Sequence, residues 1–238
     1  MKIAIIGYGK MGRAIEALAL EAGHEVILRI TAENTAELTA ENLKKADVAV
    51  EFTRPETTVS HLLLCFQCGV PVVSGTTGWL DELPRVLQAR EEHNGGFFYA
   101  SNFSIGVNIT FAVSRVLARL MQDQTSYEVA MEEVHHTQKL DAPSGTAITL
   151  AKDILQEIKR KTSWVNRAEH EEQELPIVSR RIEGVPGTHE IRYTSDVDTI
   201  TLRHEAHSRE GFARGALKAA EWMMGKSGYF GMSDLLGF

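Results

Sequence analysis

MKIAIIGYGKMGRAIEALALE, residues 1–21, is the stretch that decides the fold of the chain. The apolar run Lys2–Ile6 predicts a buried strand, and the apolar spacing of Lys10–Glu21 predicts a helix. Between them, Gly7-Tyr8-Gly9-Lys10-Met11-Gly12 matches G-x-G-x-x-G in its strand-to-helix context. Glycines let the backbone approach a pyrophosphate, and amides at the helix start face its charge. This predicts a dinucleotide site, with a ligand-free glycine turn as the alternative.

The remainder of the first hundred residues repeats the same strand-then-helix rhythm. Such alternation is the signature of a parallel sheet covered by helices on both faces. Further strands are expected at Glu25–Ile30, Val48–Phe52, Pro71–Ser74 and Phe97–Ala100, and further helices at Leu38–Lys45, Glu56–Cys68 and Leu80–His93.

After Asn102 the rhythm changes, which predicts a second domain of α+β type. Helices are expected at Val107–Met121, Gly145–Lys161 and Phe212–Met224, strands at Tyr127–Val134, Val178–Glu183, His189–Thr194 and Thr199–His204, an exposed loop at Asn166–Glu174, and a Gly-rich tail at the end. The turns between the last three strands indicate a mostly antiparallel arrangement there. We therefore expect an α/β chain: a Rossmann-like domain of residues 1–102, completed by 208–238, and a domain of residues 103–207 with an open mixed sheet that binds substrate and mediates oligomerisation.

Composition narrows the class of protein. The 238 residues are 43% hydrophobic and carry a net charge of −7, which disfavours nucleic acid and anionic membranes as partners. No apolar stretch approaches the roughly 20 residues that span a bilayer, and the apolar start is too short for a signal peptide, so we expect a cytoplasmic protein. Cys65 and Cys68 lie in an apolar helical pattern without a second cysteine pair, which favours a structural role over zinc.

Several loops at the ends of expected strands can contact a nicotinamide cofactor. Thr31 occupies the position where an acidic residue usually holds the adenine ribose, with Glu33 two residues later. Repulsion of a 2′-phosphate is then weak, so we expect NADPH to be accepted as well as NADH. Gly75-Thr76-Thr77, Ala100-Ser101-Asn102-Phe103 and Phe52-Thr53 follow three other strands; each alone is compatible with ordinary turn chemistry, but together they favour contacts with the nicotinamide and its ribose.

EEVHHTQKLDAPSGTA, residues 132–147, concentrates chemistry in one loop. Ser144 or Asp141 can cap the following helix, and Pro143 suits its first turn. The amides of Gly145 and Thr146 then form an anion pocket at the positive end of the helix dipole.

Lys139 adds a positive charge to that pocket, and His135 and His136 can exchange protons near neutral pH. The loop therefore suits a small acid that receives a proton. A metal site and a purely structural cap are the alternatives. Adjacent histidines point in different directions, however, and no carboxylate follows them at ligand spacing.

These segments together resemble the dihydrodipicolinate reductase family. HHTQKLDAPSGTA is its specific signature, and GYGKMG, EFTRPE, GTTG, ASNFSIGVN and the closing GTHEIRYTSDVDTITLRHEAHSREGFARGALKAAEWM follow the family in order and spacing. The resemblance implies reduction of 4-hydroxy-tetrahydrodipicolinate to tetrahydrodipicolinate in diaminopimelate and lysine biosynthesis, with NADH or NADPH, by a homotetramer. It implies that His135 donates the proton and that Lys139 is the second catalytic residue. His136, Gly145 and Thr146 would bind a substrate carboxylate, and Gly7 to Gly12, Gly75 to Thr77 and Ala100 to Phe103 would contact the cofactor.

The chain departs from the family pattern at two places. The stretch Ala32–Lys45 is compact, which bears on the adenine end of the cofactor site, and Glu51 replaces the commoner aspartate, a change that keeps the charge. For His204 and His207 we expect surface or structural roles, with a minor role of His204 in the substrate domain left open. Another nicotinamide-dependent reductase and a nicotinamide-binding sensor without turnover are the rival functions, and a sensor would not need a proton donor beside an anion pocket.

Overall fold

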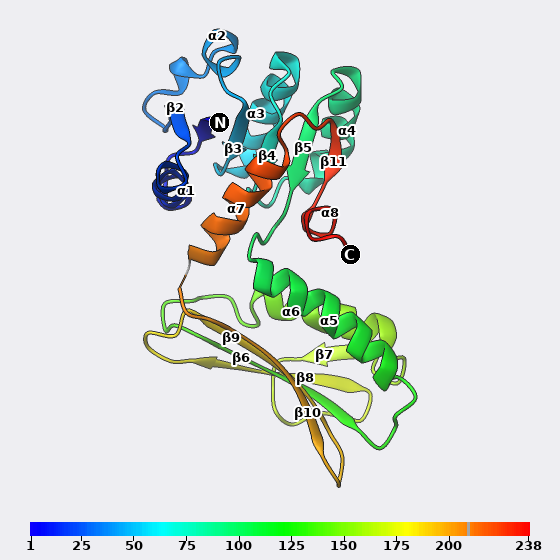
Figure 1. Cartoon of the computed structure of the whole chain (residues 1–238). Coiled ribbons are helices and arrows are strands. Elements are labelled where there is room, and N and C mark those ends of the chain that lie inside the picture. Colours follow the sequence, from blue (N-terminus) through cyan, green and yellow to red (C-terminus); the bar gives the residue numbers. More distant parts are fainter. Residues whose placement is uncertain (209) are drawn as a thin grey trace. The chain divides into compact units, whose positions relative to one another are not determined.

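The chain folds into two compact units in the computed structural model, which describes residues 1–208 and 210–238 (Figure 1). The first unit comprises Met1–Ile105 and Glu210–Phe238, and the second comprises Gly106–Arg209. Within the described residues, none of the helices is both long and apolar enough to cross a membrane. The two units are described separately below.

The first unit is built on a six-stranded sheet in which every neighbouring pair of strands is parallel. Its order is β11-β5-β4-β3-β1-β2, with β1 Lys2–Ile6, β2 Glu25–Ile30, β3 Val48–Glu51, β4 Val72–Ser74, β5 Gly96–Tyr99 and β11 Gly228–Phe230. Because β2 and β3 flank β1 on opposite sides, the chain reverses its direction of travel through the sheet at β1. In such sheets ligands bind outside the carboxyl ends of the strands at this switch point.

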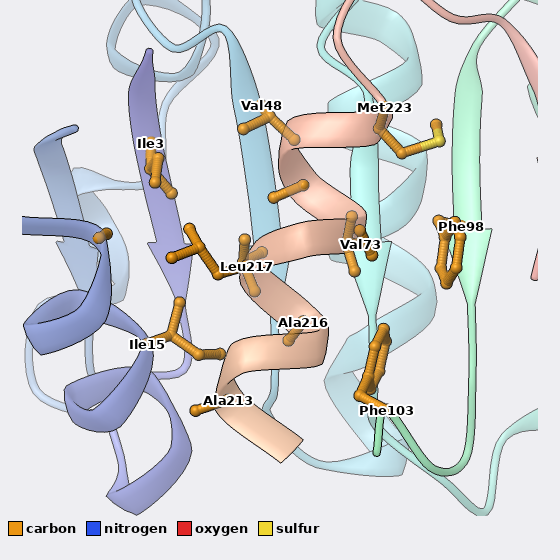
Figure 2. Packing of buried hydrophobic residues seen from close by; sticks show 14 of the residues in the cluster. Ile3, Ile15, Val48, Val73, Phe98, Phe103, Ala213, Ala216, Leu217 and Met223 are labelled. Carbon is orange, nitrogen blue, oxygen red and sulfur yellow. The ribbon is translucent and has the colours of Figure 1, made fainter. Parts of the chain in front are cut away.

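Helices cover both faces of this sheet and enclose two apolar cores. α1 (Lys10–Glu21) and α7 (Glu210–Trp222) pack on one face, where Ile15 of α1 and Leu217 of α7 lie over Ile3 and Val48 (Figure 2). The other face carries α2 Ala40–Leu43, α3 Pro55–Cys68 and α4 Leu83–Glu92, and the chain ends with α8 Met232–Leu236. The predicted Rossmann-like architecture is therefore confirmed.

Two helices of the first unit are shorter than the sequence pattern predicts, and each has a local cause. The helix expected over Leu38–Lys45 begins only at Ala40, because the Thr39 hydroxyl caps it by accepting a hydrogen bond from the amide of Asn42 (3.2 Å). The 3₁₀ turn η1 (Thr35–Glu37) precedes it. The helix expected over Leu80–His93 is divided into the 3₁₀ turn η2 (Leu80–Glu82) and α4, whose first turn contains a proline.

The Gly-rich tail contains two short elements that the sequence did not predict, β11 and α8. β11 adds a parallel edge strand to β5, and the Tyr229 ring stacks on Phe97 with ring centroids 5.3 Å apart. A three-residue strand is too short to show a periodicity in the sequence. Pairing with β5 therefore decides its conformation.

The second unit is an open mixed sheet of order β10-β9-β6-β8-β7, as predicted for the fold class. Its strands are β6 Glu128–His135, β7 Ser163–Val165, β8 Glu174–Arg181, β9 Gly187–Thr194 and β10 Thr199–Ala206. β9 is antiparallel to both β6 and β10, whereas β8 is parallel to β6 and β7. β8, β9 and β10 alternate in direction as expected, but β8 does not pair with β9, because β6 is inserted between them. β7 was not predicted.

One face of this sheet is covered by α5 (Ile105–Met121) and α6 (Gly145–Glu157), which enclose a third apolar core (Figure 1). α6 ends before the predicted Lys161, because Ile158 adopts an extended backbone and is buried in this core. The ammonium of Lys161 is itself buried and pairs with Glu128. On the opposite face the strands alternate toward exposed polar side chains, such as Arg192 and Thr201.

Candidate active site

The loop after β1 is held tightly against the ends of two neighbouring strands. The amides of Gly7 and Tyr8 both donate to the carbonyl of Ile30, at 3.0 and 2.8 Å. Gly7 has a φ of +100°, and a Cβ at this position would lie 2.0 Å from the carbonyl oxygen of Phe52. Gly12 is equally constrained, because a Cβ there would lie 2.5 Å from the oxygen of Gly7. Only glycine fits at these two positions.

The middle glycine of the motif has a different environment. A Cβ at Gly9 would meet no described atom within 4 Å, so the space beside the start of α1 is open. Gly9 is the N-cap of α1, and the first amides of a helix have no intrahelical acceptor. Lys10 is exposed beside this position, and Met11 packs against the core. An open, positively polarised helix start behind a glycine turn fits a pyrophosphate.

Charged side chains surround Tyr8 at the edge of this loop. Its hydroxyl donates to the carboxylate of Glu16, which also binds the guanidinium of Arg29. The hydrogen bond from Arg29 is the main reason why the pKa of Glu16 is lowered, although burial opposes ionisation. The guanidinium of Arg13 lies over the Tyr8 ring, 4.7 Å from its centroid. These contacts fix Tyr8 next to the glycine loop.

Thr31 lies directly after β2, as the sequence predicts for the adenine end of a dinucleotide site. Its amide donates to the side-chain oxygen of Asn34 (2.7 Å), and its hydroxyl accepts from the amide of Glu33 (3.1 Å). Asn34 also donates to the carbonyl of Arg29 (2.9 Å). The Asn34 side chain, which sequence reasoning did not single out, therefore shapes the turn, and the carboxylate of Glu33 is exposed.

Glu51, at the end of β3, is the buried centre of the neighbouring loops. Its carboxylate is fully buried and accepts hydrogen bonds from the hydroxyls of Ser74 (2.6 Å), Thr76 (3.0 Å) and Thr58 (3.2 Å). It also accepts from the amide and the hydroxyl of Thr53. Burial disfavours its ionisation, yet hydrogen bonds from His61 and these hydroxyls outweigh that cost and lower the pKa of Glu51. From the sequence, Glu51 was noted only because it replaces the aspartate that is commoner in the family. Its central position among these loops was not predicted.

The loop after β4 is immobilised by this carboxylate and by its own packing. Thr76 is buried, and its carbonyl accepts a hydrogen bond from the indole nitrogen of Trp79 (2.7 Å). A Cβ on Gly75 would lie 2.1 Å from the ring of Phe52, which leaves only a glycine at this position. Thr77 is exposed and accessible to a ligand.

The loop after β5 continues the same edge of the sheet. The amide of Ala100 donates to the carbonyl of Ser74 (3.3 Å), and the side chain of Asn102 accepts from the amide of Ser104 (2.9 Å). Ser101 is exposed, whereas the Phe103 side chain is buried 5.6 Å from the ring of Phe52. Phe103 can therefore offer a ligand its backbone rather than its ring. The loops after β1, β3, β4 and β5 lie at the same edge of one parallel sheet.

In the second unit, β6 ends at His135, and residues 136–144, which lead to α6, belong to the loop expected to bind an acid. His135 is only 8% exposed. Its Nδ1 lies 3.3 Å from Oε2 of Glu133, and its ring makes an edge contact with His189. A Cβ on Gly187 would lie 3.1 Å from its Nε2, so the absent side chain of this glycine keeps that nitrogen uncovered.

The helix start after this loop is capped by Ser144, one of the two predicted capping residues. Its hydroxyl accepts from the amide of Ala147 (3.2 Å), and its own amide donates to both oxygens of Glu133 (3.0 and 3.1 Å). The other predicted capping residue, Asp141, does not cap the helix. Because the cap is Ser144, Pro143 precedes it and does not lie in the first turn of the helix. α6 thus begins with Gly145, as expected.

Lys139 lies in the loop and forms an ion pair with Asp141 (Nζ to Oδ1 2.8 Å), and this hydrogen bond is the main cause of the lowered pKa of Asp141. His136 and Thr146 are half-buried and Gly145 is exposed. The ammonium and the helix start therefore flank a loop that can receive a carboxylate.

Two further histidines lie in register across the sheet. His189 on β9 is opposite both Glu133 on β6 and His204 on β10, and these side chains share the helix-covered face. Burial is the main cause that lowers the pKa of His189 to about 4 and also lowers that of His204. Both histidines line a small hollow with Thr146, so His204 has a half-buried structural position, whereas His207 is exposed.

Glu133, His135 and His189 are the one group among the described residues whose atoms lie close enough to share a metal ion. Two of the three, Glu133 and His189, already have hydrogen-bonding neighbours. Glu133 accepts the Ser144 amide, and Nε2 of His189 lies 3.1 Å from the Ser144 hydroxyl. A guanidinium of Arg181 also lies 3.3 Å from Glu133. A cation next to that guanidinium would be repelled, so the arrangement favours a hydrogen-bonded network over a metal centre.

Comparisons with known proteins find similar chains over the whole length of this one. The family model described as dihydrodipicolinate reductase, N-terminus, matches residues 1–103, and the corresponding C-terminus model matches residues 106–236. A 4-hydroxy-tetrahydrodipicolinate reductase of Christiangramia forsetii is 43% identical over 236 residues, which cover 99% of this chain and 98% of the relative. The protein of the same name from Neisseria gonorrhoeae is 33% identical and covers 100% of this chain and 97% of its own.

A solved structure shows the same likeness in three dimensions. Dihydrodipicolinate reductase from Paenisporosarcina sp. TG-14, with dipicolinate bound, superposes with a TM-score of 0.80 and 26% identity, covering 98% of each chain. Both halves of the chain match the family in order, and the relatives align over essentially their whole length. On this evidence the chain belongs to the dihydrodipicolinate reductase family.

Proposed function

We propose that this chain reduces 4-hydroxy-tetrahydrodipicolinate to tetrahydrodipicolinate in the diaminopimelate and lysine pathway, using NADH or NADPH. The observation that carries the proposal is the placement of His135 at the end of β6, joined through Glu133 to the capped start of α6. A proton donor at this position would lie beside a helix start that attracts anions. The names of the relatives supply the substrate and the pathway step.

The first unit would hold the dinucleotide. The open helix start at Gly9 fits the pyrophosphate, and the Thr76, Thr77 and Ser101 loops fit the nicotinamide half. Thr31 in place of an acidic residue leaves no carboxylate at the position that would repel a 2′-phosphate, which supports use of both cofactors. When bound, the reduced nicotinamide supplies a hydride to the substrate ring.

The second unit would hold the substrate and deliver the proton. The substrate hydroxyl would leave as water together with one hydrogen of the ring, a hydride would add to one ring carbon, and His135 would donate a proton to the neighbouring carbon, which balances the reaction. Because Nδ1 of His135 faces Glu133, Nε2 is the nitrogen available for donation. Lys139 and the amides of Gly145 and Thr146, together with His136, would bind the substrate carboxylates.

The direct test is the loss of reduced-nicotinamide absorbance when the purified protein meets freshly generated 4-hydroxy-tetrahydrodipicolinate, with NADH and NADPH in separate runs. We expect oxidation with both cofactors that depends on the substrate, and the ratio of the rates measures the preference. Replacement of the exposed His207 by glutamine serves as a control that should not change the rate. If the protein binds either cofactor but oxidises neither, a sensor or a different substrate replaces this proposal.

Assembly and location complete the proposal. The helix-free face of the sheet in the second unit and its eight-residue edge strand β10 support association of four chains into a homotetramer. Measuring the molar mass in solution tests this, and a monomer would contradict it. Reliance on NADH or NADPH, which are regenerated in the cytoplasm, supports a cytoplasmic location.

A further inference from the structure

Glu133 is a buried carboxylate that the reaction itself does not require. It is fully buried, although it carries a charge, and its two oxygens face four groups from four different segments. Those groups are the amide of Ser144 before α6, Nδ1 of His135 on β6, the guanidinium of Arg181 on β8 and, at 3.8 Å, Nε2 of His189 on β9. A buried charge persists only where such partners compensate its lost hydration.

Arg181 extends this contact to the loop that carries the lysine. Its guanidinium donates to the carbonyl of Asp141 (2.6 Å) and to the carbonyl of Lys139 (3.3 Å). It also contacts Oε1 of Glu133. The planar guanidinium therefore joins the backbone on either side of Leu140 to the same carboxylate that holds His135 and the helix start.

We propose that Glu133 and Arg181 form a positioning pair that sets His135, the Lys139 loop and the start of α6 in one geometry. The inference rests on the proposed function, because it assigns His135 and Lys139 their roles there. Neither member of the pair needs to touch the substrate. Glu133 would hold Nδ1–H of His135 and thereby direct Nε2–H outward, and Arg181 would fix the backbone that presents the ammonium of Lys139.

Electrostatics explains why the central group is a carboxylate. Burial opposes ionisation of Glu133, but its contacts with His135, Ser144 and Ser179 hold its pKa well below the ordinary range, so it is negatively charged near neutral pH. His189 is neutral near pH 7, because its pKa is lowered to about 4. Glu133 thus places a negative charge 3.3 Å from Nδ1 of His135, and the cation Arg181 contacts the same carboxylate.

The test replaces Glu133 by glutamine, which keeps the shape and removes the charge. The matched control is Glu132→Gln, the adjacent residue on the other face of the same strand, whose ion pair with Arg180 (3.0 Å) mirrors the Glu133–Arg181 contact. Turnover, the pH profile of kcat/KM, NADH affinity by fluorescence and dipicolinate affinity are measured for each variant. Dipicolinate is the probe because it is bound to the Paenisporosarcina relative.

We expect Glu133→Gln to lower kcat by about 10- to 100-fold, as loss of a group that orients a reacting residue commonly does. The alkaline limb of its pH profile should move to lower pH, dipicolinate affinity should fall, and NADH affinity should stay at the value of the Glu132→Gln control. If the parent enzyme is active, a Glu133→Gln variant whose kcat is within about 2-fold of the control and whose alkaline limb is not shifted would overturn the proposal. Lack of activity in the parent enzyme would instead refute the proposed function.

A second variant covers the case in which Glu133→Gln does not fold. Glu133→Asp keeps the charge but retracts it by one methylene, out of reach of the Ser144 amide or of His135. We expect a lower kcat with an alkaline limb near that of the parent, because the charge remains. A parent-like kcat in a folded Glu133→Asp protein would show that Glu133 does not act by positioning His135 and the start of α6, and the proposal would fail.

Discussion

Gly187 leaves Nε2 of His135 uncovered, so adding one methyl group there should block proton delivery. In Gly187→Ala the new Cβ would lie 3.1 Å from Nε2 and 3.2 Å from Cδ2 of His135. Ordinary contact begins at 3.4 Å, so the imidazole must shift by a few tenths of an ångström. The methyl would also occupy the distance of about 3–3.5 Å at which a reacting atom must sit.

The expected magnitude follows from this geometry. A misplacement approaching 1 Å costs about 10²-fold in rate, and a blocked approach costs at least as much, so we expect kcat to fall by about 10²-fold. Stability should change little, because the φ of Gly187 lies outside the left-handed region that strains other residues. NADH affinity should not change, since the dinucleotide would bind to the first unit.

The assay is steady-state NADH oxidation, with thermal unfolding and NADH binding measured alongside. Gly211→Ala is a suitable control, because a Cβ there meets only the Ser104 hydroxyl, at 3.9 Å. If folded Gly187→Ala turned over like the control, Nε2 would not be the donating atom, and the reasoning from its uncovered position would be refuted.

Two further predictions concern the buried acids and histidines. Glu51→Gln should raise KM for NADH and NADPH by about 10-fold and lower the free energy of unfolding by about 1–3 kcal/mol, since an amide cannot accept every hydrogen bond that Ser74, Thr76 and Thr53 donate. Urea unfolding measures the change in stability, and steady-state kinetics with each cofactor measure KM. An unchanged KM in a destabilised variant would show that Glu51 stabilises the fold without shaping the cofactor site. His189 has a pKa of about 4 in the folded state, against an ordinary value of 6.5. Between these two pH values the unfolded chain binds a proton at His189 that the folded chain does not. The free energy of unfolding should therefore fall as the pH drops from about 6.5 to about 4. His189→Gln should remove up to about 3 kcal/mol of that loss, and an unaltered pH dependence of unfolding would contradict the neutral, buried histidine.

The sequence predicted the fold well wherever a pattern was long enough to read. β1, β2 and α1 have their predicted bounds, because an unbroken apolar run and an amphipathic period each report burial directly. β7 and β11 were missed because three residues show no period. The parallel pairing of β8 with β6 was missed because β6, from much earlier in the chain, is inserted between β8 and β9. Long-range pairing of this kind leaves no local trace in the sequence.

The site divides in the same way. Motif residues such as Gly7, Gly12 and Ser144 could be read from local chemistry, since their roles come from neighbours in the chain or from a steric demand on one residue. Glu51 and Glu133 could not, because their partners come from distant strands and loops. The available signal was an acidic residue at an alternating, otherwise buried position of a strand, as in the burial of every second residue of β6.

The central claim, that His135 supplies the proton, is tested most directly in a single turnover with enzyme in excess over 4-hydroxy-tetrahydrodipicolinate. Such a measurement separates chemistry from binding and product release. For His135→Ala, we expect NADH and dipicolinate affinities near those of the parent and a rate of NADH oxidation lower by about 10²- to 10⁴-fold, as loss of a general acid requires. A parent-like single-turnover rate in His135→Ala would contradict the account.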